Sequence, residues 1–447
     1  MSKALIFSVF VFFWSFSDFV FARPFNLDFE HVPSQLIVKF AGDSKTAANH
    51  SVLRKLGGEI LVVFRTNGAI LVNFPQAKSE NELDVIAAKL SKIDTVDYIE
   101  ANTLAYFDTK IPNDPRFKEL YALHNTGQHD EDHPDVDIGA AEAWDITTGS
   151  RNVLIAVIDS GIDYSHPDIA PNYWNNPGET GLDAQGRDKR SNEVDDDHNG
   201  FIDDWRGWNF AAGNNNPMDS NGHGTHCAGT IGAKGNNNIG VVGVNWDVSL
   251  VALRIASDKE KAIPVSKTIS AIEYATSIGA VATNNSYGSR AFSRTEFAAI
   301  EAAGKKGILL VASAGNNLED DDELPHYPAS YQLNNVISVA AVDPDDSLAD
   351  YSSWGIKTVH VAAPGSFIIS TTPKNTYSDF SGTSMSTPHV TGSVALIKSV
   401  FPNLSGFEIR SRLFNTVTKT PALEGKIMTG GRINVYRALS QKLTIDD

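Results

Sequence analysis

The stretch Val153-Leu-Ile-Ala-Val-Ile-Asp159 decides the fold class, because it is a short, unbroken apolar run that ends in a carboxylate. A run of this kind without polar alternation is typical of a β-strand that is buried on both faces. Similar apolar runs follow at 248–253, 307–312 and 336–340, and segments with helical spacing at 267–278 and 295–306 lie between them. This alternation predicts a three-layer α/β/α sandwich around a mostly parallel sheet.

A smaller pattern of elements precedes this region, between residues 35 and 107. Strand-like runs occur at 35–40, 59–64, 69–74 and 96–107, and helix-like segments at 45–56 and 82–93. The resulting order, β-α-β-β-α-β, predicts a ferredoxin-like α+β unit. A stretch rich in proline and aspartate at 108–115 suits an exposed linker to the larger unit.

The first 22 residues have the composition of a secretory signal. Lys3 precedes an apolar run, and Val20 and Ala22 supply the small residues that a signal peptidase needs for cleavage after Ala22. A signal anchor is the alternative. No later segment has the roughly 18 unbroken apolar residues that span a bilayer. We therefore expect secretion, extracellular or periplasmic, and no membrane attachment once the signal is removed.

The composition restricts the partners. A net charge of −17 argues against nucleic acid as a partner, because phosphate binding needs a basic surface. Cys227 is the single cysteine, so an internal disulfide cannot form. A secreted chain without disulfides depends on a large core and on bound ions. We expect it to be a monomer.

Three polar residues stand where a parallel sheet exposes functional groups. Asp159 ends its strand, His223 opens a predicted helix in Asn221-Gly-His-Gly-Thr-His-Cys-Ala-Gly-Thr230, and Ser384 lies ahead of an apolar helix predicted at 390–400. A serine hydroxyl becomes a nucleophile when an imidazole takes its proton and a carboxylate orients that imidazole. Each residue alone is common for structural reasons, but together they predict acyl transfer.

Acyl transfer also needs hydrogen-bond donors for the oxyanion. Asn316 ends the segment Val311-Ala-Ser-Ala-Gly-Asn316, which follows an apolar strand. Its side-chain amide and the backbone N–H of Ser384 are the candidate donors. A simple turn residue is the alternative for Asn316.

Four motifs, in this order, resemble the subtilisin-like serine proteases over almost all of residues 111–440. They are VIDSGID at 157–163, NGHGTHCAGT at 221–230, SAGN at 313–316 and SGTSMSTPHVTG at 381–392. The order Asp, His, Ser is that of the subtilisin triad. The stretches 112–115, 363–366 and 431–437, with the cysteine in the histidine motif, are most similar to the thermitase branch.

The resemblance implies roles for individual residues in the hydrolysis of protein and peptide substrates. It implies that Asp159, His223 and Ser384 are the triad and that Asn316 is the oxyanion donor. It implies that the main chain of Ser286, Tyr287 and Gly288 pairs with the substrate. By alignment His326 falls at the base of the pocket for the substrate residue before the scissile bond, where many relatives have glycine. A bulky, titratable side chain there would shrink or polarise that pocket, unless His326 points to solvent.

The resemblance also implies a zymogen. Residues 33–107 look like a subtilisin-type inhibitory propeptide that helps the protease to fold and is released autocatalytically near 107–111. The implied division is a signal peptide at 1–22, a propeptide at 23–110 and a catalytic domain at 111–447. An unrelated ferredoxin-like domain is the alternative for the N-terminal unit.

Calcium is the expected cofactor, at one or two structural sites, because hard cations prefer clustered oxygen ligands. At the first site the resemblance implies side-chain oxygens from Asp114, Asp168 and Asn237, with carbonyl oxygens from Ile239 and Val241.

The second predicted calcium site is the acidic stretch 195–204, which by the resemblance lies in an insertion relative to the short subtilisins. Asp195, Asp197, Asn199 and Gly200 copy the first half of an EF-hand loop, but Arg206 stands where the bidentate glutamate belongs. Asp203 is the candidate replacement for that glutamate. An acidic surface loop is the alternative.

Two other functions make different demands on the sequence. A pseudoprotease that only binds peptides would lack a member of the triad or the oxyanion donor, and all four residues are present. A metal hydrolase that uses His223 and His226 would need the HExxH spacing, which this motif lacks. Cys227 lies four residues after His223, on the same predicted helix face, and is expected to be a buried support for the imidazole.

Overall fold

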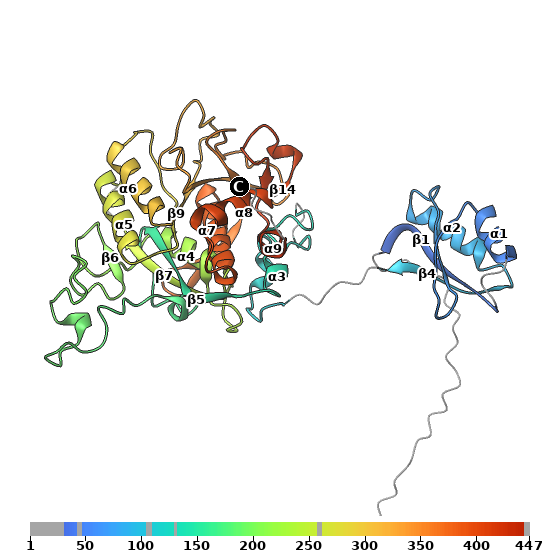
Figure 1. Ribbon diagram of the computed structural model, residues 1–447, viewed down its shortest axis with the longest axis horizontal. Helices are drawn as coiled ribbons and strands as arrows, with labels where there is room; N and C mark the ends of the chain where they lie inside the picture. The colour runs from blue at the N-terminus through green and yellow to red at the C-terminus, as the bar shows by residue number, and fades with distance from the viewer. Residues whose placement is uncertain (1–30, 43–46, 104–109, 129–131, 257–261, 442–447) are drawn as a thin grey trace, which may run out of the picture. The chain divides into compact units, whose positions relative to one another are not determined.

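A computed structural model describes residues 31–42, 47–103, 110–128, 132–256 and 262–441 (Figure 1). The chain divides into two compact units, one within residues 1–108 and the other within 109–447. The predicted signal segment lies outside the described residues. Among the helices of the described ranges, none is both long and apolar enough to cross a membrane.

The N-terminal unit is a four-stranded antiparallel sheet, in the order β2-β3-β1-β4, with two helices packed on one face. Its elements are β1 (His31–Phe40), α1 (Ala47–Lys55), β2 (Glu59–Val63), β3 (Ile70–Asn73), α2 (Glu80–Leu90) and β4 (Val96–Thr103). Alternate residues of β1, Leu36, Val38 and Phe40, are fully buried against both helices. This unit confirms the predicted β-α-β-β-α-β order.

The larger unit contains a nine-stranded sheet in the order β14-β15-β11-β10-β9-β8-β5-β7-β6. Its strands are β5 (Gly149–Asp159), β6 (Gly207–Asn209), β7 (Asp247–Arg254), β8 (Ala282–Asn285), β9 (Leu309–Ser313), β10 (Val336–Val342), β11 (Val361–Pro364), β14 (Thr418–Lys419) and β15 (Gly431–Arg432). All neighbouring pairs are parallel except β14 with β15. The predicted mostly parallel sheet is confirmed.

Helices cover both faces of this sheet (Figure 1). They are α3 (Ala140–Ala143), α4 (His223–Gly232), α5 (Val265–Ser277), α6 (Arg294–Lys305), α7 (Thr383–Val400), α8 (Gly406–Asn415) and α9 (Val435–Ser440). A separate hairpin is formed by β12 (Ile368–Thr372) and β13 (Thr376–Phe380).

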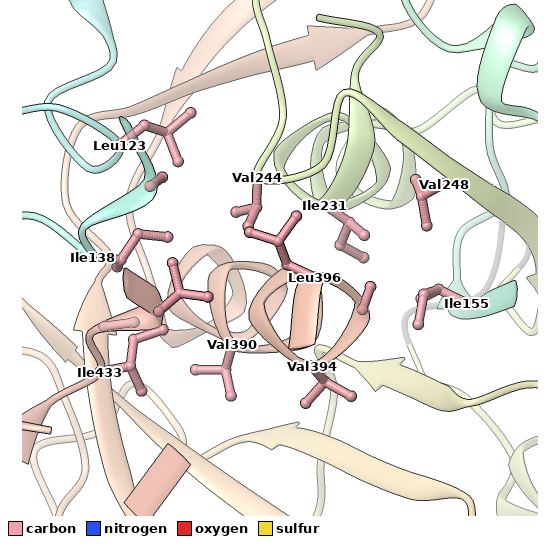
Figure 2. Packing of buried hydrophobic residues seen from close by; sticks show 14 of the residues in the cluster. Leu123, Ile138, Ile155, Ile231, Val244, Val248, Val390, Val394, Leu396 and Ile433 are labelled. Carbon is pink, nitrogen blue, oxygen red and sulfur yellow. The ribbon is translucent and has the colours of Figure 1, made fainter. Parts of the chain in front are cut away.

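Strand β5 is buried on both faces, as its apolar run predicts. Ile155 belongs to the core cluster around α7, where Val390 and Val394 lie among residues of α4 and β7 (Figure 2). Ala156 and Ile158 belong to the cluster beneath α5 and α6. Because each face of the strand packs against a helical layer, Asp159 is fixed at the carboxyl end of the sheet.

Candidate active site

Asp159 and His223 are joined by a hydrogen bond. Asp159 is the last residue of β5 and His223 is the first of α4. Nδ1 of His223 lies 2.8 Å from Oδ1 and 3.0 Å from Oδ2 of Asp159. The backbone N–H of Ser160 also donates to Oδ1, at 2.7 Å. Because Nδ1 must be the donor to a carboxylate, Nε2 of the neutral imidazole is left as an acceptor.

The start of α4 approaches β5 closely because residue 224 is glycine. A Cβ atom at Gly224 would lie 3.0 Å from the Cβ atom of Asp159 and would collide with the carbonyl of Gly161. The N–H of Gly224 donates instead to Oγ of Ser160, at 2.9 Å. The glycine after His223 therefore sets the separation of the carboxylate and the imidazole.

Asp219 holds the N-terminus of α4, a role that the sequence analysis missed. Its buried carboxylate accepts from the N–H groups of Asn221, Gly222 and Thr225, at 2.8, 3.1 and 3.0 Å. The hydroxyl of Thr225 donates a fourth hydrogen bond to it, at 2.6 Å. An acidic residue just before a predicted helix start was the available signal, because helix N-termini favour negative charge.

The pKa of His223 is raised above its ordinary value. The charge of Asp159 is the largest cause, burial acts against it, and the hydrogen bond to Asp159 and the charge of Asp219 add to the increase. The imidazole therefore keeps its proton to a higher pH than a free histidine does.

Ser384 lies in the first turn of α7, at the N-terminal end where the helix dipole favours negative charge. Its hydroxyl donates to the carbonyl of Ser286 at 3.4 Å. Within the described residues, no hydrogen bond joins Ser384 to His223. Hydrogen bonds between a nucleophile and its base are often long in the absence of substrate and shorten when it binds.

Helix α7 begins at Thr383, although the sequence analysis expected it only from residue 390, after Pro388. Pro388 has no N–H, so it cannot donate to the carbonyl of Ser384 four residues earlier. That carbonyl accepts instead from Oγ of Ser286 at 3.0 Å and from Sγ of Cys227 at 3.5 Å. These outside donors replace the missing helical bond, so the helix continues through the proline.

Cys227 is fully buried, and its thiol lies beside the hydrogen-bonded side chains of Asp159 and His223. Its sulfur, an imidazole nitrogen of His223 and a carboxylate oxygen of Asp159 all lie within 4.8 Å of one another. Burial raises the pKa of the thiol, so Cys227 remains protonated and donates to the Ser384 carbonyl. This geometry suits a support for the site better than a nucleophile.

His226 is also buried, and it takes a structural role. Its Nε2 lies 2.9 Å from the carbonyl of Ile368 and 3.1 Å from that of Ser378, and its ring stacks on Phe380. Burial is the main cause that lowers its pKa to about 4. Because Nε2 contacts two carbonyls, it is the protonated nitrogen and is not available to a metal ion.

Asn316 is oriented by Thr383. The N–H and the hydroxyl of Thr383 both donate to Oδ1 of Asn316, at 2.9 and 2.8 Å. Because Oδ1 accepts both hydrogen bonds from Thr383, the Nδ2 group of Asn316 points away from Thr383 and can donate to another acceptor. The N–H of Ser384, in the first turn of α7, has no partner within the helix. The two groups can serve one developing negative charge.

The segment 286–288 follows β8 and runs past Ser384. Oγ of Ser286 bonds the Ser384 carbonyl, and the Tyr287 hydroxyl donates to Oδ1 of Asn285 at 3.1 Å. The imidazole of His326 reaches this segment, because a side chain on Gly288 would collide with Nε2 of His326. His326 is therefore half-buried beside the site and does not point simply to solvent.

Asp114 and Asp168 form the first predicted cation site with the loop at 236–241. Oδ2 of Asp114 accepts from the N–H of Asn236 at 2.7 Å, whereas its buried Oδ1 has no partner among the described residues. Asp168 accepts from Nδ2 of Asn237 at 2.8 Å and from the N–H of Val241 at 3.0 Å. Burial is the largest cause that raises the pKa of both carboxyls, that of Asp114 to about 6.

The carbonyl oxygens of Ile239 and Val241, the other predicted ligands, accept no hydrogen bond from the residues that the structure describes. The Oδ1 atom of Asn237 accepts from the N–H of Ile239 at 2.8 Å, which closes the loop.

A second acidic cluster includes one of the predicted carboxylates, that of Asp197, together with two that were not predicted. Carboxylate oxygens of Glu179, Asp197 and Asp204 lie within 4.8 Å of one another. Glu179 and Asp204 are fully buried, and Oε2 of Glu179 has no partner among the described residues. Burial raises the pKa of Glu179 to about 7. This cluster can hold a metal ion.

Of the ligands predicted at 195–204, two lie at the cluster and two lie in neighbouring turns. Asn199 bonds Asp204 through Nδ2 at 2.9 Å, so Asn199 and Asp197 lie at the cluster. Asp195 accepts from the N–H groups of Asn199 and Gly200, and Asp203 accepts from that of Glu193. Both carboxylates thus close turns and are not among the carboxylates of the cluster, so their role as ligands stays a prediction. Asp204 was adjacent to the predicted set, whereas Glu179 carries no local sequence signal.

Comparisons with known proteins give a family match for each unit. The model of the Subtilase family matches residues 150–430. The model described as the Fervidolysin N-terminal prodomain matches residues 26–102.

Curated relatives are about one third identical to this chain over the aligned residues. The thermophilic serine proteinase of Bacillus sp. (strain AK1) is 33% identical, over 92% of this chain and 88% of that protein. Thermitase of Thermoactinomyces vulgaris is 33% identical over 68% of this chain and 93% of its own length. Subtilisin-like protease 1 of Plasmodium vivax is 38% identical over 68% of this chain, but the match spans only 50% of that protein.

Among solved structures, a chain titled as proteases from Pseudoalteromonas arctica PAMC 21717 is similar, with a TM-score of 0.57 and 28% identity. The match covers 74% of this chain and 99% of that chain.

Proposed function

This chain belongs to the subtilase family of serine peptidases and carries an N-terminal prodomain, and from that premise we propose that it is a secreted endopeptidase made as a self-processed zymogen. The observation that carries the proposal is the Asp159–His223 hydrogen bond, beside which the Cys227 thiol donates to the carbonyl of Ser384 in the first turn of α7. The proposed substrates are proteins and peptides, whose extended chain pairs with the main chain of Ser286, Tyr287 and Gly288.

In the proposed mechanism, Nε2 of His223 takes the proton of the Ser384 hydroxyl while Oγ attacks the scissile carbonyl. Asp159 keeps Nδ1 protonated and stabilises the imidazolium that forms. Nδ2 of Asn316 and the N–H of Ser384 donate to the oxyanion. His223 then passes its proton to the leaving amine, which leaves an acyl-enzyme on Ser384. Water, deprotonated by His223, hydrolyses this ester and restores the enzyme.

We propose that residues 23–110 are the inhibitory propeptide and that 111–447 are the catalytic domain, with a signal peptide at 1–22. The prodomain match and the compact antiparallel unit support the first assignment. Release of the propeptide by the enzyme itself would activate it.

The function is tested by expression of the full chain and by two assays of the purified product. We expect loss of the N-terminal unit over time, measured by intact mass, and hydrolysis of casein that begins as this unit is lost. A chain that stays intact and does not cleave casein would contradict the proposal.

We propose calcium as the structural cofactor at two sites. The first fits because Asp114 and Asp168 place buried carboxylates together, one with an oxygen that has no partner. There Asp114, Asp168 and Asn237 would hold the ion with the carbonyls of Ile239 and Val241. At the second site Glu179, Asp197 and Asp204 offer carboxylates, with a free buried oxygen on Glu179. A bound cation would neutralise carboxylates that are otherwise costly to bury.

Removal of calcium is expected to lower the melting temperature, because an ion that binds only the folded state stabilises it. At about 1,000 times the dissociation constant this contribution is about 4 kcal/mol per site. Differential scanning calorimetry with and without a chelator, on the Ser384→Ala chain to prevent autolysis, measures it.

Matched variants assign the effect to the two sites. Asp114→Ala and Glu179→Gln should each reduce the calcium-dependent shift. Asp188→Asn, which removes a half-buried carboxylate that pairs with Arg190 away from the cluster, should leave the shift unchanged. An equal melting temperature with calcium and with chelator would contradict both sites.

A further inference from the structure

We propose that the ring of His326 is the floor of the pocket for the substrate residue before the scissile bond, and that it restricts this residue to short, neutral, hydrogen-bonding side chains such as serine and threonine. This inference rests on the proposed function, since it assigns a substrate class to that site. The pocket is called the P1 pocket below.

The position of the ring follows from two glycines. A Cβ atom on Gly315 would lie 3.3 Å from Nδ1 of His326, and a side chain on Gly288 would collide with Nε2. The ring therefore lies between the backbone of 286–288 and that of 313–316. Both segments adjoin the nucleophile, because Ser286 bonds the Ser384 carbonyl and the N–H of Gly315 donates to Oγ1 of Thr383 at 3.2 Å.

The same gap must receive a substrate side chain. A substrate carbonyl carbon bonded to Oγ of Ser384, with its oxygen at Nδ2 of Asn316, lies between these two backbone segments. The side chain of that residue then enters the gap between Gly288 and Gly315, which the imidazole already fills in part. On this placement only a short side chain is accommodated above the ring, whereas a phenylalanine, leucine or lysine side chain would have to displace a ring that already contacts both backbones.

The ring is held in place by its own backbone. The N–H of His326 donates to Oγ of Ser330 at 2.9 Å, and the N–H of Ser330 returns a bond to the carbonyl of His326 at 2.8 Å. The next residue, Tyr327, exchanges two backbone hydrogen bonds of 2.8 Å with Ser289. Because the segment is tied at both positions, its backbone cannot move away from the pocket without breaking these bonds, and a large substrate residue would have to rotate the ring out of the gap.

The ring offers polar groups to the pocket. Within the described residues, neither nitrogen of the half-buried imidazole has a hydrogen-bond partner. Burial, with a smaller contribution from the charge of Arg290, lowers the pKa of His326 to about 4, so the ring is neutral at neutral pH. A neutral imidazole has one donor and one acceptor nitrogen, which is the complement of a hydroxyl group.

The neighbouring charges do not favour a charged substrate residue. Arg290 is the adjacent cation, but it forms an ion pair with Glu319, and its Nη1 lies 4.0 Å from Oδ1 of Asp321. These acids belong to the run at 319–323, so an acidic side chain would meet an already neutralised arginine and further carboxylates. A basic side chain would meet the positive charge of Arg290 and, being long, would have to displace the ring.

The inference also selects the bond at which the zymogen processes itself. In the segment 104–110, Leu-Ala-Tyr-Phe-Asp-Thr-Lys, only Thr109 is short, neutral and able to hydrogen-bond. We therefore expect cleavage between Thr109 and Lys110 and a mature chain that begins at Lys110, one residue before the domain boundary proposed above.

The test compares peptides that differ only at P1, with serine, alanine, phenylalanine, aspartate or lysine. The values of kcat/KM are measured for the wild type, His326→Gly and His326→Leu, and each is divided by the fraction of active sites. For the wild type we expect serine to exceed alanine about fivefold, the value of one net hydrogen bond. We expect serine to exceed phenylalanine about 100-fold, as for a pocket that is too small.

The two variants distinguish the effect of the volume of the His326 ring from the effect of its hydrogen-bonding nitrogens. His326→Gly should raise kcat/KM for phenylalanine about 100-fold, because the floor is removed. His326→Leu refills the space without nitrogen atoms, so it should still reject phenylalanine but lose the preference of serine over alanine. A P1 profile that is the same in the wild type and both variants would overturn the inference, as would a wild-type preference for phenylalanine.

The mature N-terminus gives an independent result that needs no variant. Intact mass should show a chain starting at Lys110, and a start at Asp108, after Phe107, would contradict the small pocket. These failures leave the proposed function standing as long as Ser384 is required for cleavage. If the wild type cleaves none of the peptides and no casein, the proposed function itself is wrong.

Discussion

Substitution of Ser384 by alanine is expected to lower kcat for casein or peptide hydrolysis by about 10⁶-fold and to leave the N-terminal unit attached. The physical reason is that the proposed chemistry has no other nucleophile. The Cys227 thiol is fully buried, is protonated and donates to a carbonyl. Loss of the nucleophile in a serine protease typically costs about this factor, and the remaining rate comes from the oxyanion donors and binding.

The measurement is intact mass over time together with kcat for a peptide substrate. Ser399→Ala is the matched control, since Ser399 lies near the other end of α7 and bonds Thr147 and Leu396. It should process and hydrolyse normally. If Ser384→Ala still loses the N-terminal unit at the wild-type rate, with contaminating proteases excluded, another residue performs the chemistry.

Substitution of Asp159 by asparagine is expected to lower kcat by about 10⁴-fold, because the imidazole then takes the wrong tautomer. It should also change the pH dependence. The neutral form of His223 is the active base, so kcat/KM rises with pH as the imidazole loses its proton. The Asp159 charge is the main cause that raises this pKa. Removing that charge lowers the pKa, so the rising limb should move to lower pH.

Profiles of kcat/KM between about pH 5 and pH 9 measure this shift, a range in which histidine titrates. Asp163→Asn is a nearby control, because Asp163 also follows β5 and is buried but bonds Ser165 and the N–H of Lys374. The Asp163→Asn enzyme should show the same rise of kcat/KM with pH as the wild type. An Asp159→Asn enzyme with full activity, or with a limb moved to higher pH, would contradict the assignment of Asp159.

The fold was largely predictable because its signals are local. The apolar run at 153–158 implies burial on both faces, and β5 contributes Ile155 to one core cluster and Ala156 to the other. The start of α7 was not predicted, because Pro388 was expected to prevent a helix before residue 390. Proline ends a helix reliably only when the carbonyl four residues earlier has no other hydrogen-bond donor. Here Ser286 and Cys227, both distant in sequence, supply the donors.

The candidate site was predictable only where its residues sit in contiguous motifs. Asp159 and His223 were expected together, and the structure joins them by a hydrogen bond. Asp219 was missed because its contribution is a set of hydrogen bonds to a helix start, which depends on the three-dimensional path of 219–225. Glu179 was missed because its carboxylate reaches Asp197 and Asp204 from outside the EF-hand-like loop. Spacing within a motif cannot show such distant partners.

The central claim, that Ser384 is a nucleophile activated by His223, is tested most directly by the site of a covalent adduct. The processed wild-type chain is treated with a serine-directed fluorophosphonate, and its peptides are mapped by mass spectrometry. We predict a single adduct on the peptide that contains Ser384, with activity lost in proportion to labelling. A chain that still cleaves casein while Ser384 carries no adduct, or that is inactivated by an adduct at another residue, would contradict the claim.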